Sequence, residues 1–305
     1  MGTNYSITLG IQSELSIEEI QGEIDTLLES INQQMSTYIE DSELSIINQS
    51  NSHEWLEISP ELFKVISSAL EISQLTGGAF DITVGNLVNL WGFGPDDTHS
   101  IMPDDESIES AMRASGYLNI ELQTQPYAIK KLNSDIYLDL SGIAKGYAVD
   151  RVSEYLDEKY LSSYLVDIGG EIRTKGEKRN EQPWRIGIEK PLAKTREVLR
   201  IVTLVNEAMA TSGDYRNFFV KNGIHYSHTI DPRTGYPIRY NLLSITVLDQ
   251  SAMVADALAT ALLVMGPEGS ITFAENNEIP AYLIYSDGNL MIERFTSQFI
   301  PHINE

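Results

Sequence analysis

The sequence contains no cysteine among its 305 residues. Disulfides, cysteine-ligated zinc, iron–sulfur clusters and a thiol nucleophile are therefore excluded. Basic residues are also scarce, 21 against 44 acidic ones, which gives a formal net charge of −23. Nucleic acid is not an expected partner, because its phosphate backbone would be repelled. An anionic small molecule would need a cation, a loop of backbone amides or a few local basic side chains to be held.

The chain also lacks the marks of a membrane-spanning or multidomain protein. No run of about 18 apolar residues occurs, so no transmembrane helix is predicted. No sequence repeat and no Pro- or Ser-rich linker divides the chain. With 42% hydrophobic residues, it is long enough to bury a large core. We expect one enzyme domain over residues 1–305, in which any lobes share an interface that can form a cleft.

Hydrophobic periodicity predicts strands and helices in mixed runs, without strict alternation. Ser16 begins a capping-box pattern before an amphipathic helix that ends near Met35. The other predicted elements are a strand at 5–11, helices at 60–76, 105–115, after 142 and at 252–265, a hairpin of strands 127–132 and 136–140, strands near 163–168, 184–188, 198–205 and 243–248, and a hairpin turn at 286–288. This order predicts an α+β fold.

Asp256 and Thr260 form the first candidate site. They are four residues apart on a predicted helix, so their oxygens share one face. The surrounding residues are nearly all Ala, Leu, Val and Met, and a carboxylate buried there needs a partner. A hard cation such as Mg²⁺ would serve, with substrate phosphate oxygens completing its coordination. An ion pair with a Lys or Arg elsewhere in the chain is the alternative.

A glycine-containing loop at 139–146 forms the second candidate site. The segment Ser-Gly-Ile-Ala-Lys-Gly (141–146) follows a predicted strand and begins a helix, where free backbone amides can bind an anion. It lacks the spacing of a Walker A loop. Phosphate binding and an ordinary turn both remain open. Asp139, just before the loop, is either a helix cap or an anchor for it.

His228 is a candidate general base. It lies at the predicted end of a strand, three residues before the turn that starts at Asp231-Pro232. A structural or simply exposed histidine is the alternative. Upstream, the double glycine at 77–78 is followed by Phe80-Asp81, which suits a flat ring beside exposed backbone and equally suits ordinary helix termination.

Taken together and in order, these segments resemble the ApbE family of FAD:protein FMN transferases. The motifs are Met-Gly-Thr (1–3), Met-Ser-Thr-Tyr (35–38) with Ser-Glu-Leu-Ser (42–45), Gly-Ala-Phe-Asp-Ile-Thr-Val-Gly (78–85), Leu-Trp-Gly-Phe-Gly (90–94), Asp-Leu-Ser-Gly-Ile-Ala-Lys-Gly-Tyr-Ala-Val-Asp (139–150), Asp-Ile-Gly-Gly-Glu (167–171), Ala-Thr-Ser-Gly-Asp-Tyr-Arg (210–216), His-Thr-Ile-Asp-Pro-Arg-Thr-Gly-Tyr-Pro (228–237) and Ala-Asp-Ala-Leu-Ala-Thr (255–260). The resemblance covers nearly the whole chain.

The resemblance implies a fold related to the T-fold, with mixed antiparallel sheets, packed helices and FAD in a cleft between two closely associated lobes. It implies magnesium at the backbone carbonyl of Ala144, the carboxylate of Asp256 and the hydroxyl of Thr260. Some relatives carry a further acid where this chain has Ala259. The positions that match flavin-binding residues of the family are Met35, Ala79, Phe80, Asp81, Ser141, Tyr147 and Ile230.

These expectations combine into a mechanistic hypothesis. A Ser or Thr hydroxyl of an acceptor protein attacks the FMN-side phosphorus of FAD, and AMP leaves. Positioning and charge neutralisation supply most of the acceleration. We expect His228 to take the hydroxyl proton, with Asp231 or Ser227 orienting it, Asp256 to hold the metal, and Lys145 to help hold the phosphates. An FAD pyrophosphatase, with water as the nucleophile, and a non-catalytic FAD-binding protein are the alternatives.

The resemblance also implies partners and a location. Acceptors in this family are redox proteins, such as membrane respiratory subunits, that carry FMN on a Ser or Thr. Relatives are usually exported bacterial proteins anchored by a lipid on a cysteine upstream of the Met-Gly-Thr motif. We therefore expect a periplasmic or cell-envelope protein, lipid-anchored in its precursor through a leader that precedes residue 1.

Overall fold

The computed structural model describes residues 2–10, 16–95, 102–178, 181–191, 197–213, 218–221, 224–239, 241–288 and 290–303. The chain forms two compact units. Unit 1 comprises Met1–Leu28, Lys145–Arg216 and Tyr240–Glu305, and unit 2 comprises Glu29–Ala144 and Asn217–Arg239. The expectation of a single catalytic domain over 1–305 stays a prediction.

Unit 1 is built on a seven-stranded sheet in which every neighbouring pair is antiparallel. In spatial order its strands are β1 (Tyr5–Leu9), β5 (Tyr164–Ile168), β6 (Glu171–Lys175), β9 (Ala208–Gly213), β14 (Leu242–Asp249), β15 (Ala281–Asp287) and β16 (Leu290–Phe295). Successive side chains alternate between the two faces. Both faces of this sheet are covered within the unit, which accounts for its many buried residues.

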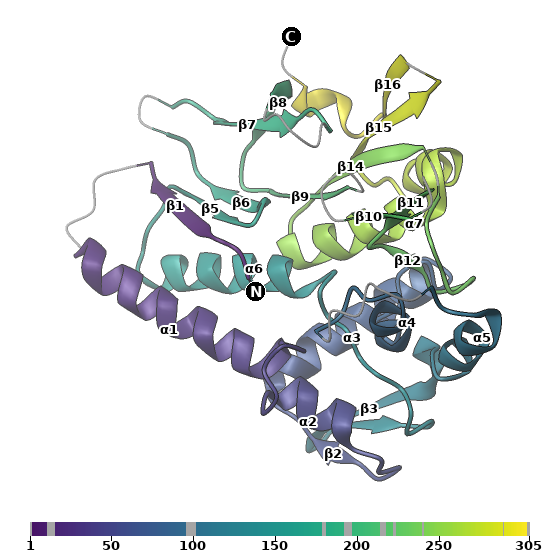
Figure 1. Cartoon of the computed structure of the whole chain (residues 1–305). Helices are drawn as coiled ribbons and strands as arrows, with labels where there is room; N and C mark the ends of the chain where they lie inside the picture. The colour runs from purple at the N-terminus through teal and green to yellow at the C-terminus, as the bar shows by residue number, and fades with distance from the viewer. Residues whose placement is uncertain are drawn as a thin grey trace. The chain divides into compact units, whose positions relative to one another are not determined.

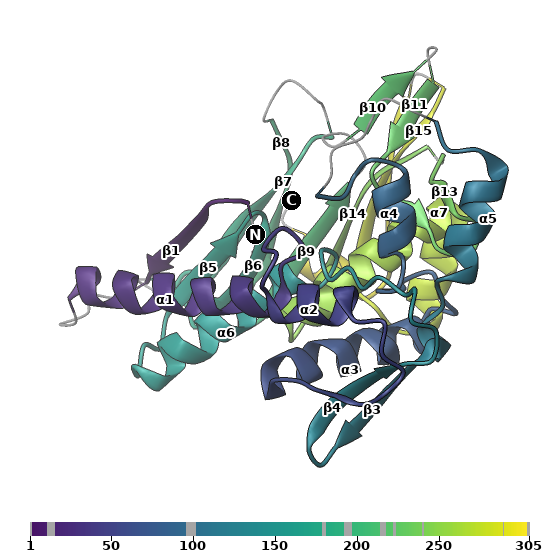
Figure 2. The same ribbon diagram turned by 60° about the horizontal axis from the view of Figure 1, so that its bottom comes forward.

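Two helices, α6 (Ala144–Glu158) and α7 (Ala252–Asn276), lie on one face of this sheet (Figures 1 and 2). On the other face a hairpin of β7 (Trp184–Glu189) and β8 (Val198–Leu204) packs with the short helix η2 (Ile300–His302). Its core is a cluster in which Trp184 and Val202 of the hairpin join Ile172 of β6, Met209 of β9 and Ile284 of β15. The sheet is thus sandwiched, and α6 and α7 meet on its helical face.

Helix α7 is apolar around most of its circumference, as a helix inside a core should be. Among the described helices it alone has the length and mean hydropathy of a membrane span, yet 61% of that apolar window is buried inside the protein. Its regular path is interrupted at Gly266, which has φ 73°, followed by Pro267. The predicted helix from Ser251 to Met265 is therefore confirmed, and a second helical segment follows it to Asn276.

Unit 2 is mainly helical. Its elements are α2 (Glu43–Gln49), α3 (Pro60–Leu75), α4 (Gly85–Leu90), α5 (Asp105–Arg113), η1 (Tyr117–Asn119), a sheet of β2 (Leu56–Glu57), β4 (Tyr127–Lys131) and β3 (Ile120–Thr124), and the pairs β10 (Phe218–Lys221) with β11 (Ile224–Ser227) and β12 (Ile230–Asp231) with β13 (Tyr236–Pro237). Helix α1 (Ile17–Met35) contributes its residues from Glu29 onward. A cluster around Trp91, whose indole N–H donates to the carbonyl of Gly235 at 2.9 Å, includes Leu87, Ile108, Tyr226 and Ile230.

One predicted element is wrong. Segments 127–132 and 136–140 do not form a hairpin. Instead, β4 pairs with the preceding strand β3, to which a turn at residues 125–126 connects it, and β3 is absent from the prediction. Residues 136–140 instead run beside other loops of unit 2. Asn48 exchanges two side-chain hydrogen bonds with the backbone of Leu138 at 2.7 and 2.9 Å, and the N–H of Asp139 donates to the carbonyl of Ile82 at 2.8 Å. Long-range contacts of residues 138 and 139 therefore take the place of strand pairing with β4.

The other predicted elements are confirmed, with ends that shift by a few residues. Ser16 caps α1 by accepting the N–H of Glu19 at 3.3 Å, and Ser59 caps α3 by accepting the N–H of Leu62 at 3.2 Å. The predicted strand at 5–11 ends at Leu9, and residues 11–15 lie outside the described part. Residues 214–216, the end of one family motif, lie outside it as well.

Candidate active site

Helix α7 carries the two candidate metal ligands, Asp256 and Thr260. Ser251 caps this helix by accepting the N–H of Val254 at 3.3 Å. Residues four apart lie on the same side of a helix, so the prediction of a shared face is confirmed. Asp256 is only 2% exposed, and its charge therefore requires partners.

Both carboxylate oxygens of Asp256 contact α6. The backbone N–H of Gly146 donates to Oδ2 at 3.0 Å, and Nζ of Lys145 lies 3.4 Å from Oδ1. The alternative in which Asp256 pairs with a lysine is thus observed. The contact at Oδ1 is long, since charge-assisted hydrogen bonds are usually about 2.7–2.9 Å. Oδ1 is therefore the less engaged of the two oxygens.

A second acid, Glu171, completes this cluster. It is the first residue of β6, and its Oε1 lies 2.9 Å from Nζ of Lys145, so the ammonium group is shared between two carboxylates. The other oxygen, Oε2, is buried and has no hydrogen-bond partner among the described residues. The sequence motifs assign Glu171 no role. Its signal in the sequence is alternation, because Glu171, Arg173 and Lys175 place a charge at every second position of β6 and therefore on one face of the strand.

The electrostatics of the cluster favour one more positive charge. Burial opposes the charged form of Lys145, but the carboxylates of Asp256 and Glu171 outweigh it and hold the pKa of Lys145 above its usual value. Burial raises the pKa of Glu171 to about 7, against the effect of Lys145 and with a contribution from Asp256. One ammonium faces two carboxylates, so the fully ionised cluster is net negative.

Gly146 allows α6 and α7 to approach closely enough for these contacts. A Cβ at this position would lie 2.2 Å from the carbonyl oxygen of Ala252 and 2.7 Å from Cα of Met253. Any larger residue would therefore push the two helices apart. The absence of a side chain lets the N–H of Gly146 reach the carboxylate of Asp256.

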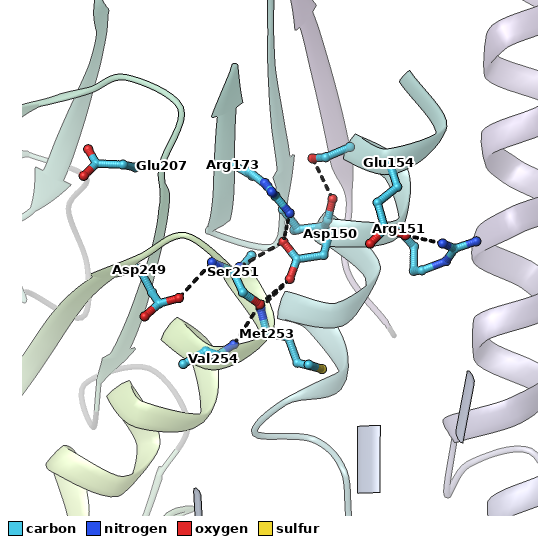
Figure 3. A network of polar contacts seen from close by, with 12 residues as sticks. Asp150, Arg151, Glu154, Arg173, Glu207, Asp249, Ser251, Met253 and Val254 are labelled. Carbon is cyan, nitrogen blue, oxygen red and sulfur yellow. Dashed lines mark hydrogen bonds and ion pairs between the residues drawn. The ribbon is translucent and has the colours of Figure 1, made fainter. Parts of the chain in front are cut away.

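Asp150, also on α6, ties the same two helices together (Figure 3). Its carboxylate accepts the hydroxyl of Ser251 at 2.6 Å and the backbone N–H groups of Ala252 and Met253 at 2.9 and 3.1 Å. Arg173 of β6 donates to it at 2.6 Å. The first N–H groups of a helix lack intrahelical acceptors and favour a negative charge. Asp150 therefore fixes the start of α7 against α6, and with it the position of the metal-ligand candidates.

A strand of the sheet contributes a hydroxyl to the site. Oγ of Ser212, on β9, lies 3.3 Å from Oγ1 of Thr260. The Ala-Thr-Ser-Gly motif thus meets the Ala-Asp-Ala-Leu-Ala-Thr motif across the helix–sheet interface. Thr260 as a whole residue is partly exposed.

In unit 2 the carboxylate of the candidate flavin-binding residue Asp81 accepts hydrogen bonds from Thr83 and Tyr117. Its Oδ1 accepts the N–H and hydroxyl of Thr83 at 2.8 and 2.7 Å, and Oδ2 accepts the N–H of Tyr117 at 2.9 Å. Burial raises the pKa of Asp81, although these hydrogen bonds oppose the shift. The carboxylate thereby stabilises the loop after α3, and its contact with flavin stays a prediction.

The remaining predicted flavin-binding residues belong to both units. Unit 2 contains Met35 at the end of α1, Ala79 and Phe80 after α3, Ser141 before α6 and Ile230 in β12, and unit 1 contains Lys145 and Tyr147 on α6. Ser141 is exposed, and its N–H donates to Oδ1 of Asp139 at 2.8 Å, so Asp139 anchors the loop. Within unit 1, the structure brings Lys145 together with Asp256. The flavin contacts stay predictions.

His228 follows β11 and is half-buried, and its ring forms a T-shaped pair with the ring of Phe93 at a centroid distance of 6.4 Å. The predicted position at a strand end is confirmed. Asp231 accepts hydrogen bonds from the guanidinium of Arg233 at 2.9 Å through both oxygens. Oγ of Ser227 accepts the N–H two residues further on at 3.1 Å. The orientation of His228 by either residue stays a prediction.

Within the described part of the chain, no group of three or more His, Asp or Glu side chains could hold a metal ion. A cation at Asp256 would therefore need hydroxyl, backbone or substrate oxygens as well. Such a ligand set, with few protein carboxylates, is typical of magnesium at phosphate-binding sites.

Comparison with known proteins decides the family. The model of the ApbE family matches residues 1–283. The chain belongs to the ApbE family. An FAD:protein FMN transferase of Vibrio cholerae is 46% identical over 308 residues, covering 100% of this chain and 91% of that protein. One of Haemophilus influenzae is 41% identical, covering 98% and 88%.

Solved ApbE structures have the same fold. The flavin transferase ApbE from Vibrio cholerae matches with a TM-score of 0.91 at 44% identity, covering 99% of this chain and 96% of that one. The apo form of the flavinyl transferase ApbE from Pseudomonas stutzeri also matches with a TM-score of 0.91, at 35% identity and with 99% and 94% covered. The ApbE resemblance of the sequence motifs and the predicted α+β fold are thus confirmed.

Proposed function

We propose that this protein transfers FMN from FAD to a Ser or Thr hydroxyl of an acceptor protein and releases AMP. Family membership over residues 1–283 supports this proposal, as do relatives named FAD:protein FMN transferase at 46% and 41% identity. The acidic cluster on the helical face of unit 1 is the observation that carries it. Such a cluster would repel a diphosphate unless a cation were bound there.

The residues present fit a divalent cation. Oδ1 of Asp256 has only a long contact with Lys145, and the cluster of one ammonium and two carboxylates is net negative when fully ionised. We propose that this cation is magnesium. The Asp256 carboxylate, the Thr260 hydroxyl and the Ala144 carbonyl would hold it. When bound, magnesium would neutralise charge on the FAD pyrophosphate.

The chain's own residues have distinct tasks in this proposal. The N–H of Gly146 orients Asp256, and Lys145 holds phosphate oxygens by its charge. The acceptor oxygen forms a bond to the FMN-side phosphorus while the bond from that phosphorus to the AMP oxygen breaks. The hydroxyl proton passes to His228 as general base. A histidine suits this role because its ordinary pKa is near neutrality.

Incubation with FAD, Mg²⁺ and a candidate acceptor tests the reaction. We expect the acceptor to gain the mass of one FMN unit and AMP to appear in equal amount. Asp256→Ala should lower the rate by about a thousandfold or more, the effect of losing a major electrostatic contact in the transition state. Glu268→Ala, on the same helix but with an exposed side chain, is the matched control and should stay active.

The alternatives give other products. Free FMN and AMP formed at the same rate with and without the acceptor would identify a pyrophosphatase. Tight FAD binding that is indifferent to EDTA and yields no AMP would identify a flavin-binding protein. Unimpaired transfer by Asp256→Ala without added metal would overturn the assignment of the cation.

The proposal extends to acceptor and location. The acceptors would be redox proteins, such as membrane respiratory subunits, that carry FMN on a Ser or Thr. We propose a periplasmic or cell-envelope location, with a lipid anchor in the full-length precursor. The absence of cysteine from these 305 residues is compatible with an oxidising compartment. Fractionation of the native host, with the protein detected in cytoplasm, periplasm and membranes, tests this. A cytoplasmic location would contradict it.

A further inference from the structure

Lys145 lies between two carboxylates that it does not contact equally. Its Nζ is 2.9 Å from Oε1 of Glu171 and 3.4 Å from Oδ1 of Asp256. The side chains of Glu171 and Asp256 are only 5% and 3% exposed, so the ammonium of Lys145 is a major neutralising charge for both carboxylates. The position of one cationic group therefore decides how much of the Asp256 charge is neutralised.

We propose that Glu171 is a positioning residue that holds Lys145 away from Asp256 and so keeps Oδ1 available to a divalent cation. This inference rests on the proposed function, because it concerns the cation assigned to Asp256 there. It adds to that function a contact between two side chains that sets the affinity for the cation. Glu171 acts through Lys145 and does not itself bind the ion.

Glu171 is well supported for this task. It is fixed in β6, and Arg173, two residues along the same face, is anchored to Asp150 of α6 at 2.6 Å. Lys145 lies near the beginning of the same helix. Strand and helix are thus joined at two points, which fixes Glu171 relative to the ammonium it attracts.

Only one of the two carboxylate oxygens of Asp256, Oδ1, is placed to bind a cation in this proposal. Its Oδ2 is engaged by the N–H of Gly146 at 3.0 Å, which leaves Oδ1 for Lys145 or a metal ion. Lys145 and the cation therefore compete for one oxygen. If Glu171 lost its charge, the ammonium would be attracted by Asp256 alone, and cation binding would weaken.

A double-mutant cycle on the full chain without FAD tests this. Mn²⁺ is titrated and followed by electron paramagnetic resonance, and Mg²⁺ is titrated by calorimetry, for the wild type, Glu171→Gln, Lys145→Met and the double variant. We expect Glu171→Gln to weaken binding by about tenfold in the wild type and by about threefold or less in the Lys145→Met background, since contacting residues are coupled. Lys145→Met alone should tighten binding.

Other outcomes would overturn the proposal. An equal loss in both backgrounds would mean that Glu171 ligates the ion directly, and no loss in either would mean that it has only a structural role. Thermal unfolding of each variant checks folding, and Lys145→Gln replaces Lys145→Met if the latter does not fold. Asp256→Asn distinguishes failure of this inference from failure of the proposed cation site. If this variant binds the ion as tightly as the wild type, the proposed cation site itself is wrong.

Discussion

The two units hold buried charges by different means. In unit 1 the ammonium of Lys145 is neutralised by side chains from two other elements, Glu171 of β6 and Asp256 of α7. In unit 2 the side chain of Lys131 is almost completely buried, and its Nζ donates to backbone carbonyls, that of Ile136 at 3.2 Å and that of Asn48 at 3.5 Å.

The two lysines therefore have opposite pKa shifts. The acids around Lys145 raise its pKa, whereas burial lowers the pKa of Lys131 and the charge of Asp135 only partly opposes that effect. A charge balanced by other side chains can be exchanged for another charge, such as a metal ion. The ammonium of Lys131 contacts neutral backbone carbonyls, which attract a replacement cation less strongly than carboxylates do. This difference explains why a cation is assigned to the first cluster.

The largest effect on stability is expected for Lys145→Met, which removes the ammonium group at the centre of the unit 1 cluster. Two buried carboxylates would lose their shared ammonium, and we expect the free energy of unfolding to fall by about 4 kcal/mol. Because Mg²⁺ can replace the lost charge, millimolar Mg²⁺ should recover part of the loss. Urea unfolding with Mg²⁺ or EDTA measures both. Equal stability of the variant and the wild type in EDTA would show that Lys145 does not neutralise the two buried carboxylates.

Asp150→Asn tests whether the second ion pair of unit 1 is as important as the first. The change leaves Arg173 without its anionic partner and weakens the cap on α7, and we expect a loss of about 3 kcal/mol. It should also weaken Mn²⁺ binding, since α7 carries Asp256. A loss of stability with unchanged Mn²⁺ affinity would show that Asp150 does not position the site.

Gly146→Ala examines the close approach that makes the unit 1 cluster possible. The added Cβ would collide with the carbonyl of Ala252, so we expect about 2 kcal/mol of destabilisation. The matched control is Gly22→Ala on α1, where a Cβ would meet no atom of the described residues within 4 Å. There alanine should stabilise the protein by about 0.5–1 kcal/mol. Calorimetric melting of both variants checks the difference in sign.

Lys131→Met should have the smallest effect, with a distinct pH dependence. Its pKa in the folded state is below the usual 10.5, so protonated Lys131 destabilises the fold at neutral pH. We expect the variant to be more stable than the wild type by no more than about 1 kcal/mol at pH 7. That advantage should shrink as the pH rises toward 10.5, where the unfolded chain also loses the proton. Urea unfolding at pH 7 and pH 10 measures it, and an advantage that grows with pH would contradict the sign.

Local patterns in the sequence were sufficient wherever neighbouring residues decide the outcome. The serine caps of α1, α3 and α7 are such cases, because the cap and the amides it satisfies lie within three residues. The shared face of Asp256 and Thr260 follows from helical periodicity. The hairpin expected around 133–135 is wrong because the segment meant to be its second strand bonds to distant partners: Leu138 to Asn48 and Asp139 to Ile82.

The sequence by itself determined the family, the α+β class, most elements and the residue types of the site, since ordered motifs and periodicity are local properties. Only the tertiary structure placed Lys145 between Glu171 and Asp256, which are separated by 85 positions in the chain. Only it linked Asp150 to the start of α7. The reason is physical: the charge of a buried group depends on what packs around it, and that packing joins segments whose separation in sequence carries no information about their distance.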